Sequence, residues 1–78
     1  MKVKVSLYAT LRRYAPDGKG NDFELDFHPK STVGAICESL GIPANIDAVM
    51  LINGRHATGD TRLLAGDTVT LYPTIAGG

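Results

Sequence analysis

The chain has 78 residues, which allows one small domain and leaves little room for a deep cleft with a full set of catalytic groups. Eight basic side chains balance eight acidic ones, which argues against a nucleic acid or an acidic membrane bound by bulk charge. A hydrophobic share of 44% indicates a globular domain, and one cysteine cannot form an internal disulfide, an iron–sulfur cluster or a zinc site.

The first two predicted elements are strands that pair as a wide hairpin. Residues 2–8 alternate with period two, so that three apolar side chains share one face: Val3, Val5 and Leu7. The alternation breaks after residue 8, and turn-forming residues follow at 16–21. It resumes at 22–27, again with three side chains directed inward: Phe23, Leu25 and Phe27.

A helix is predicted after Pro29, which ends the second strand. Ser31 or Thr32 can cap its N-terminus. Gly41 suits a left-handed C-terminal cap, and Pro43 prevents the helix from continuing. The apolar positions recur at i, i+3, i+4 and i+7 and form one buried stripe: Val33, Ile36, Cys37 and Leu40.

A second hairpin is predicted from residues 48–52 and 55–57, joined by the two-residue turn Asn53-Gly54. Residues 60–64 are typical of a short turn or a 3₁₀ segment. The last strand covers residues 68–72, with Val69 and Leu71 inward.

Pro73 is expected to stop this last strand. The element order then predicts an α+β domain of the ubiquitin-like β-grasp type, in which a mixed sheet of four to five strands packs on one main helix. We expect the domain to cover residues 1–73 and a flexible Gly-Gly tail to cover residues 74–78.

The tail offers a chemical function. The last two residues, Gly77 and Gly78, carry no side chain, so the end of the backbone can enter a channel too narrow for a Cβ atom. A free carboxylate on Gly78 would be ionised at neutral pH. It can attack the α-phosphate of ATP to form an acyl-adenylate, from which a second nucleophile displaces AMP. Terminal glycines are also common at frayed chain ends, which is the simpler reading of this dipeptide.

Four segments together resemble the MoaD branch of the MoaD/ThiS sulfur-carrier family. They are LYATLRRY at residues 7–14, INGR at 52–55, LAGDTV at 64–69 and YPTIAGG at 72–78. The resemblance covers essentially the whole chain in order. One departure is Thr74, which stands where the family often has a second proline after the aromatic residue.

The resemblance implies a carrier rather than an enzyme by itself. Such a protein is the small subunit of molybdopterin synthase, in a heterotetramer with two large subunits. A ubiquitin-activating-type enzyme adenylates its last glycine, which becomes a thiocarboxylate that donates sulfur in molybdenum cofactor biosynthesis. On this chain Gly78 would bear the sulfur, and Gly77 would keep the channel clear. No cofactor is expected on the chain, because ATP would bind to the activating partner.

A docking surface is expected at the base of the tail. Tyr8 and Tyr72 fall on the faces of their strands opposite the core, and the first and last strands of a β-grasp are neighbours. Pairing across the turn sets Leu51 opposite His56 on that same face. The resemblance implies that partners contact these side chains and the tail residues Pro73, Thr74, Ile75 and Ala76.

Other readings stay open. The same tail chemistry suits a sulfur carrier for thiamine thiazole, tRNA thiolation or a tungsten cofactor, and it suits a ubiquitin-like modifier that forms isopeptide bonds through Gly78. A non-covalent interaction module with an idle tail is a further alternative. Cys37 is expected to be a core residue, and His28 and His56 lack the companions of a metal or catalytic site.

The chain is expected to be cytoplasmic and to bind no membrane. Lys2 and Lys4 interrupt the apolar segment that a signal peptide would need. The longest apolar run, residues 48–52, is far shorter than the about 20 residues that span a bilayer.

Overall fold

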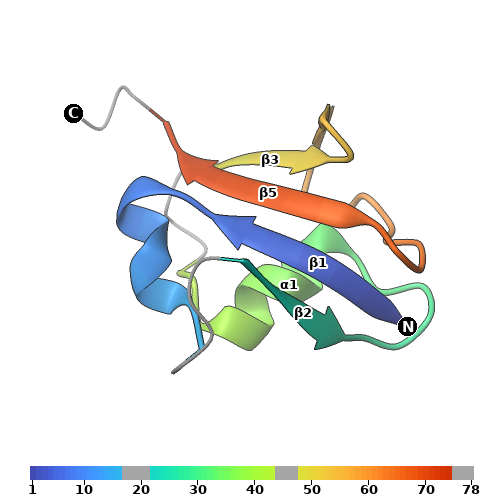
Figure 1. Ribbon diagram of the computed structural model, residues 1–78. Helices are drawn as coiled ribbons and strands as arrows, with labels where there is room; N and C mark the ends of the chain where they lie inside the picture. The colour runs from blue at the N-terminus through green and yellow to red at the C-terminus, as the bar shows by residue number, and fades with distance from the viewer. Residues whose placement is uncertain (17–21, 44–47, 75–78) are drawn as a thin grey trace.

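The computed structural model describes residues 1–16, 22–43 and 48–74 (Figure 1). The described residues form a sheet, one α-helix and one 3₁₀ helix. The bounds are β1 Lys2–Leu7, η1 Ala9–Tyr14, β2 Asp22–Asp26, α1 Val33–Leu40, β3 Ala48–Ile52, β4 Arg55–Ala57 and β5 Thr68–Pro73. None of the helices in these ranges has the length and apolar character needed to cross a membrane.

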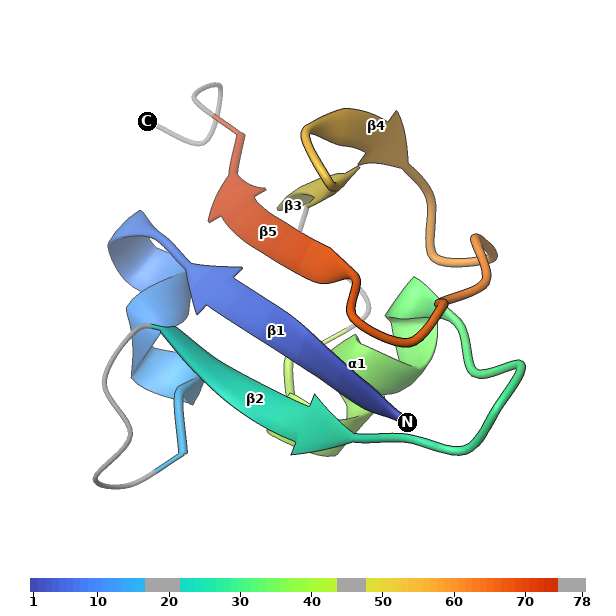
Figure 2. The same ribbon diagram turned by 45° about the vertical axis from the view of Figure 1, so that its right-hand side comes forward.

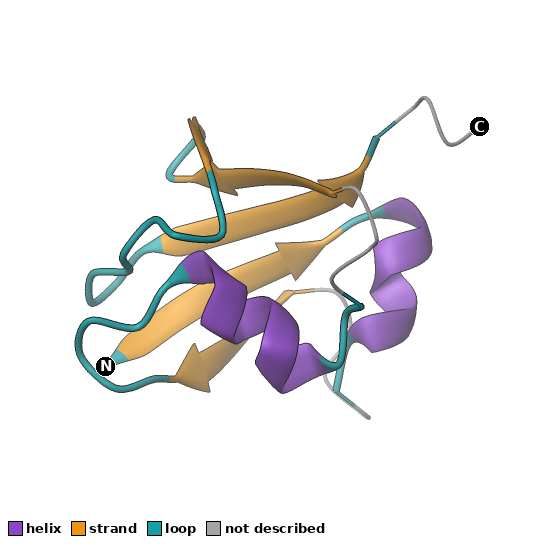
Figure 3. Ribbon diagram, turned by 180° about the vertical axis from the view of Figure 1, so that it is seen from behind, coloured by secondary structure: helices purple, strands orange, loops and turns teal. Residues whose placement is uncertain are grey.

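The strands form one mixed five-stranded sheet in the order β2-β1-β5-β3-β4. The two central strands, β1 and β5, are parallel, and the other neighbours are antiparallel. Both α1 and η1 lie on the same side of the sheet (Figure 3). The predicted α+β architecture, a ubiquitin-like β-grasp with one main helix, is therefore confirmed. We call the side of the sheet opposite α1 the outer face.

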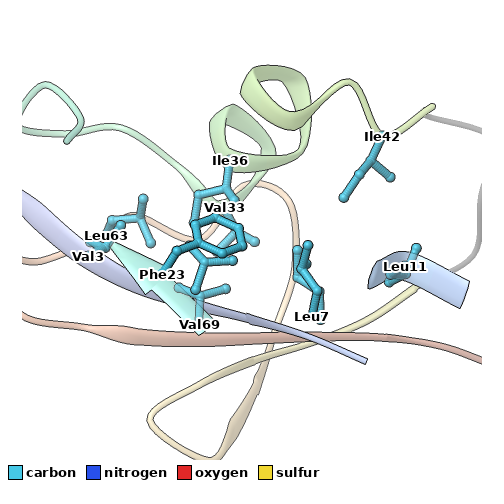
Figure 4. Packing of buried hydrophobic residues seen from close by; sticks show 11 residues of the cluster. Val3, Leu7, Leu11, Phe23, Val33, Ile36, Ile42, Leu63 and Val69 are labelled. Carbon is cyan, nitrogen blue, oxygen red and sulfur yellow. The ribbon is translucent and has the colours of Figure 1, made fainter. Parts of the chain in front are cut away.

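The core lies between the sheet and the two helices. Side chains from β1, β5, α1 and η1 point toward one another there (Figure 4). The alternation in β1 and β5 is confirmed, because Val3, Val5, Leu7, Val69 and Leu71 are all buried. Burial of each such side chain contributes about 1.5–3 kcal/mol to folding. Val33 and Ile36 of the predicted helix stripe are also buried, and three further core residues lie outside the predicted apolar faces: Leu11, Ile42 and Leu63.

The ends of α1 differ in how well the sequence predicts them. The C-terminal cap is confirmed: Gly41 has φ 78°, and the Ile42 N–H donates to the Cys37 carbonyl at 2.9 Å. At the N-terminus, Thr32 occupies the cap position but its side chain makes no capping hydrogen bond. Carbonyls of the 59–61 loop replace it, because the first two amides of α1 donate to them at 2.9 Å each.

Some predicted boundaries were wrong. β1 ends at Leu7 and β2 at Asp26, one residue earlier than predicted, and β5 includes Pro73, which pairs with Ala48 at the strand end. Proline fits there because a terminal strand residue need not donate to the ladder. Of the two alternatives predicted for residues 60–64, a short turn or a 3₁₀ segment, the 3₁₀ segment does not form. A turn at 59–60 leads instead to an isolated bridge between Arg62 and Thr32.

The 3₁₀ helix lies earlier in the chain, at Ala9–Tyr14, where only a break in the strand pattern was predicted. Its signal is the spacing of Leu11 and Tyr14, because side chains three residues apart align on a 3₁₀ helix. Leu11 is 1% exposed and anchors η1 to the core.

Candidate functional site

The predicted C-terminal tail would begin at the end of β5. Pro73 is the last residue of that strand, and Thr74 follows it as a half-buried residue. The predicted tail residues Ile75, Ala76, Gly77 and Gly78 lie outside the described residues. The structure therefore describes only the residues that precede this segment, and we call residues 72–74 the tail root.

Tyr8 and Tyr72 lie beside one another at this base. β1 and β5 pair in register with Leu7 next to Leu71, and the Tyr8 N–H donates to the Leu71 carbonyl at 3.1 Å. Leu7 and Leu71 both point into the core, so the residues that follow them are on the outer face. Tyr8 is 48% exposed and Tyr72 is half-buried. The predicted proximity of the first and last strands is confirmed.

Leu51 and His56 lie farther along the same outer face. They are paired across the β3–β4 hairpin, as predicted, and Leu51 is also paired with Thr70 of β5. Leu51 is half-buried, and His56 is exposed on the edge strand. The sheet thus places the predicted aromatic and apolar side chains on one surface, with Tyr72 nearer the tail and His56 at the margin.

Val49 is a residue of this surface that the sequence analysis did not single out. It pairs with Tyr72 in the β3–β5 ladder and is half-buried on the outer face. Its signal is the unbroken apolar run 48–52. A strand with one face in water alternates apolar and polar residues, so an apolar residue at every position indicates that both faces are covered or docked. We call Tyr8, Val49, Leu51 and Tyr72 the outer patch.

The helix η1 directly follows Tyr8 but lies on the helix side of the sheet, where it packs against β1 and β5 (Figure 1). Its Arg12 and Arg13 are exposed. These arginines give this end of the molecule a cationic margin, consistent with a surface on which a charged partner can be oriented.

Other reactive groups do not converge on the site. Burial raises the pKa of the Cys37 thiol, which is half-buried on α1 and packs against the core. A thiol with a raised pKa is a weak nucleophile at neutral pH. In the part of the chain that the structure describes, no three His, Cys, Asp or Glu side chains lie together as metal ligands would.

Comparisons with known proteins agree with the fold. The sequence model described as Mut7-C ubiquitin matches residues 1–77. No curated protein is significantly similar in sequence. Small archaeal modifier protein 1 of Haloferax volcanii superimposes with a TM-score of 0.77 at 22% identity, covering 95% of this chain and 98% of that one.

Two other solved structures bear names from molybdopterin synthesis. One is a putative molybdopterin converting factor, subunit 1, from Pyrococcus furiosus, with a TM-score of 0.74, 24% identity and coverage of 95% and 98%. The other comes from a complex of subunits 1 and 2 of molybdopterin-converting factor from Helicobacter pylori, with a TM-score of 0.63, 21% identity and complete coverage of both chains. At these identities the likeness shows a shared fold.

Proposed function

Because the chain belongs to the Mut7-C ubiquitin family, whose ubiquitin-like fold it has, we propose that it is a sulfur carrier of the MoaD/ThiS type. In this proposal it is the small subunit of a molybdopterin synthase. The observation that carries the proposal is the placement of the outer patch at the tail root. A partner that docks on Tyr8 and Tyr72 would receive the segment that ends in Gly77 and Gly78.

The chemistry proposed for the tail needs no group from the folded domain. The Gly78 carboxylate attacks the α-phosphorus of ATP, and pyrophosphate leaves. A hydrosulfide ion then attacks the acyl carbon, AMP leaves, and the product loses its thiol proton. The resulting thiocarboxylate later donates its sulfur to a pterin precursor. ATP, the sulfur source and the precursor bind to partners in this scheme.

The partners proposed are a ubiquitin-activating-type adenylating enzyme and a large synthase subunit. The likeness to a subunit of a two-subunit molybdopterin-converting factor supports the second of these. Both partners would use the outer patch, since it adjoins the tail. Half-buried tyrosine and aliphatic side chains are favourable at the centre of an interface, and exposed arginines suit its rim.

The experiment that tests this proposal is intact-mass measurement of the chain after co-expression with its adenylating enzyme. Conversion of the terminal carboxylate should add about 16 Da, the difference between sulfur and oxygen. A variant that lacks Gly78 should keep its unmodified mass under the same conditions. An unchanged mass of the intact chain with every cognate adenylating enzyme would contradict the proposal.

A second candidate function is protein modification. The likeness to a protein named as a small archaeal modifier favours it, because an acyl-adenylate on Gly78 can also react with a lysine amine. Tagged chain expressed in its host would then form high-mass species that resist boiling in detergent and disappear when Gly78 is deleted. A sulfur carrier alone would give the thiocarboxylate and no such species.

A further inference from the structure

A second surface lies at the end of the sheet away from the tail root. The edge strand β4 (Figure 2) starts at Arg55 opposite Ile52, which pairs with Val69 near the start of β5, whereas the tail root follows the end of β5. Beside it lies a shallow hollow of about 530 Å³. Its lining includes an apolar part, Ile52, Ala57 and Leu64, and a cationic part, Arg55 and Arg62.

The backbone of β4 faces outward at His56. The Asn53 N–H donates to the Thr68 carbonyl of β5, so alternate residues of β3 bond toward β5 and the residues between them bond toward β4. Leu51 therefore bonds toward β5, and its partner His56 receives no ladder bond from it. The N–H and carbonyl of His56 are thus directed away from β3, toward the edge of the sheet.

Leu64 gives this surface an apolar anchor point. It is 70% exposed. Among the described residues, the other exposed large hydrophobic residue is Tyr8, at the opposite end of the molecule. An exposed leucine beside an unpaired strand edge offers an apolar contact to a strand that pairs at that edge.

The charge of the hollow selects the partner. Arg55 and Arg62 are exposed on its rim. The one carboxylate that lines it, Asp67, is 7% exposed and accepts hydrogen bonds from Asn53 and from the Leu64 N–H. Since this carboxylate is turned inward and already bonded, the rim presents net positive charge.

We propose that β4 and this hollow bind an extended, acidic segment of a partner protein, which adds to the sheet as a strand next to β4. The segment bonds through its backbone to His56, as in other cases of strand addition. Its side chains alternate, so residues two apart face the hollow on the side of Arg55 and Ala57. At the positions that face the hollow, we expect the partner segment to carry an apolar residue, which contacts Leu64, and acidic residues, which pair with Arg55 and Arg62. This proposal does not depend on the tail chemistry.

The test is an NMR titration of the ¹⁵N-labelled full chain with the blocked peptide acetyl-Glu-Thr-Val-Thr-Glu-Thr-amide. Its Glu, Val and Glu side chains fall on one face of a strand. Saturable shifts should centre on His56 and Leu64. The double variant Arg55→Glu/Arg62→Glu should weaken binding at least tenfold. The matched control Arg12→Glu/Arg13→Glu carries the same charge change at the other end and should bind like the wild type.

A backbone variant separates strand addition from charge attraction. His56→Pro removes an N–H that does not bond to β3, so the hairpin should persist while peptide binding falls at least tenfold. If the charge variant fails to fold, this variant and a peptide with lysine in place of glutamate decide the question. The proposal is overturned if shifts do not saturate, if they centre on β2, if the lysine peptide binds equally, or if both double variants lose binding alike.

Discussion

The side-chain amide of Asn53 donates a 3.0 Å hydrogen bond to the carboxylate of Asp67, which joins the β3–β4 turn to the start of β5. The same Asn53 side chain accepts a bond from the Thr68 N–H at 3.0 Å, and the second oxygen of Asp67 accepts one from the Leu64 N–H at 2.7 Å. Asn53 also has φ 51°, so it serves both the turn and this network.

Removal of the carboxylate should therefore destabilise the fold. Asp67→Ala leaves the Asn53 amide and the Leu64 N–H without their partner in a nearly buried place. We expect a loss of about 1–3 kcal/mol in the free energy of unfolding. Urea denaturation followed by circular dichroism measures it. Asp60→Ala, at an exposed position, is the matched control and should change stability by less than about 0.5 kcal/mol. Equal effects of the two substitutions would contradict the network.

At the N-terminus of α1, we expect a glycine-to-alanine substitution to destabilise the protein, contrary to helix propensity. A Cβ atom on Gly34 would lie 3.1 Å from the carbonyl oxygen of Gly59, which accepts the Gly34 N–H at 2.9 Å. Gly34→Ala should thus lower stability by about 1 kcal/mol, although alanine is the better helix former. The exposed Ser39→Ala in the same helix should raise stability slightly. Thermal unfolding of both variants checks the difference, and a stabilised Gly34→Ala would show that the 59–61 loop yields.

The burial of Leu11 and Leu25 differs from what the sequence predicts. Leu11 is 1% exposed, and Leu11→Ala should cost about 2–5 kcal/mol. Leu25, predicted to point inward, is only half-buried near the sheet edge, so Leu25→Ala should cost less. Chemical denaturation of both variants ranks them. The reverse order would mean that η1 contributes little to the core.

The burial of Cys37 predicts that the stability of the fold depends on pH in the alkaline range. Burial raises its thiol pKa in the folded protein, so the native state holds this proton more tightly than the unfolded chain does. The resulting contribution to stability is complete below the ordinary thiol pKa and is lost as pH rises through the raised one. Reaction with a disulfide reagent should also be slower than in the unfolded chain. Cys37→Ala is the control, and it should remove this part of the alkaline loss of stability.

Tyr72 tests the outer patch under the proposed function. Tyr72→Asp would place a charge in an apolar contact, and we expect binding to the adenylating enzyme to weaken at least tenfold, or about 1.4 kcal/mol. Thr68→Asp, on the same face and strand but away from the tail root, should bind nearly as well as the wild type. Calorimetric titration measures both. Wild-type affinity in Tyr72→Asp would exclude this patch from the interface.

The sequence predicts the elements whose pattern is local. Alternation in β1 and β5, the Asn53-Gly54 turn and the left-handed Gly41 all follow from period, turn chemistry and backbone conformation. The helix η1 escaped prediction because its short pattern is anchored by one residue, Leu11, whose burial depends on distant strands. The capping of α1 by the 59–61 loop and the burial of Leu63 could not be predicted for the same reason, because both depend on contacts between distant segments.

For the candidate site, the sequence predicts the composition of the outer patch better than its extent. Tyr8 and Tyr72 follow from strand alternation once β1 and β5 are neighbours. Val49 was missed because an apolar run does not show which of its residues face outward until the pairing register is known. The hollow beside β4 was missed because Arg55, Arg62 and Leu64 meet only through the course of the loop between β4 and β5.

The parallel pairing of β1 with β5 also has a consequence during synthesis. The first strand to leave the ribosome must wait for the last one before the middle of the sheet can form, since β2 and β3 each pair with only one of the two. A nascent chain that stops short of Thr68 lacks the strand that joins both halves. Such an incomplete chain would leave edges of β1 and β3 unpaired, and unpaired strand edges favour aggregation.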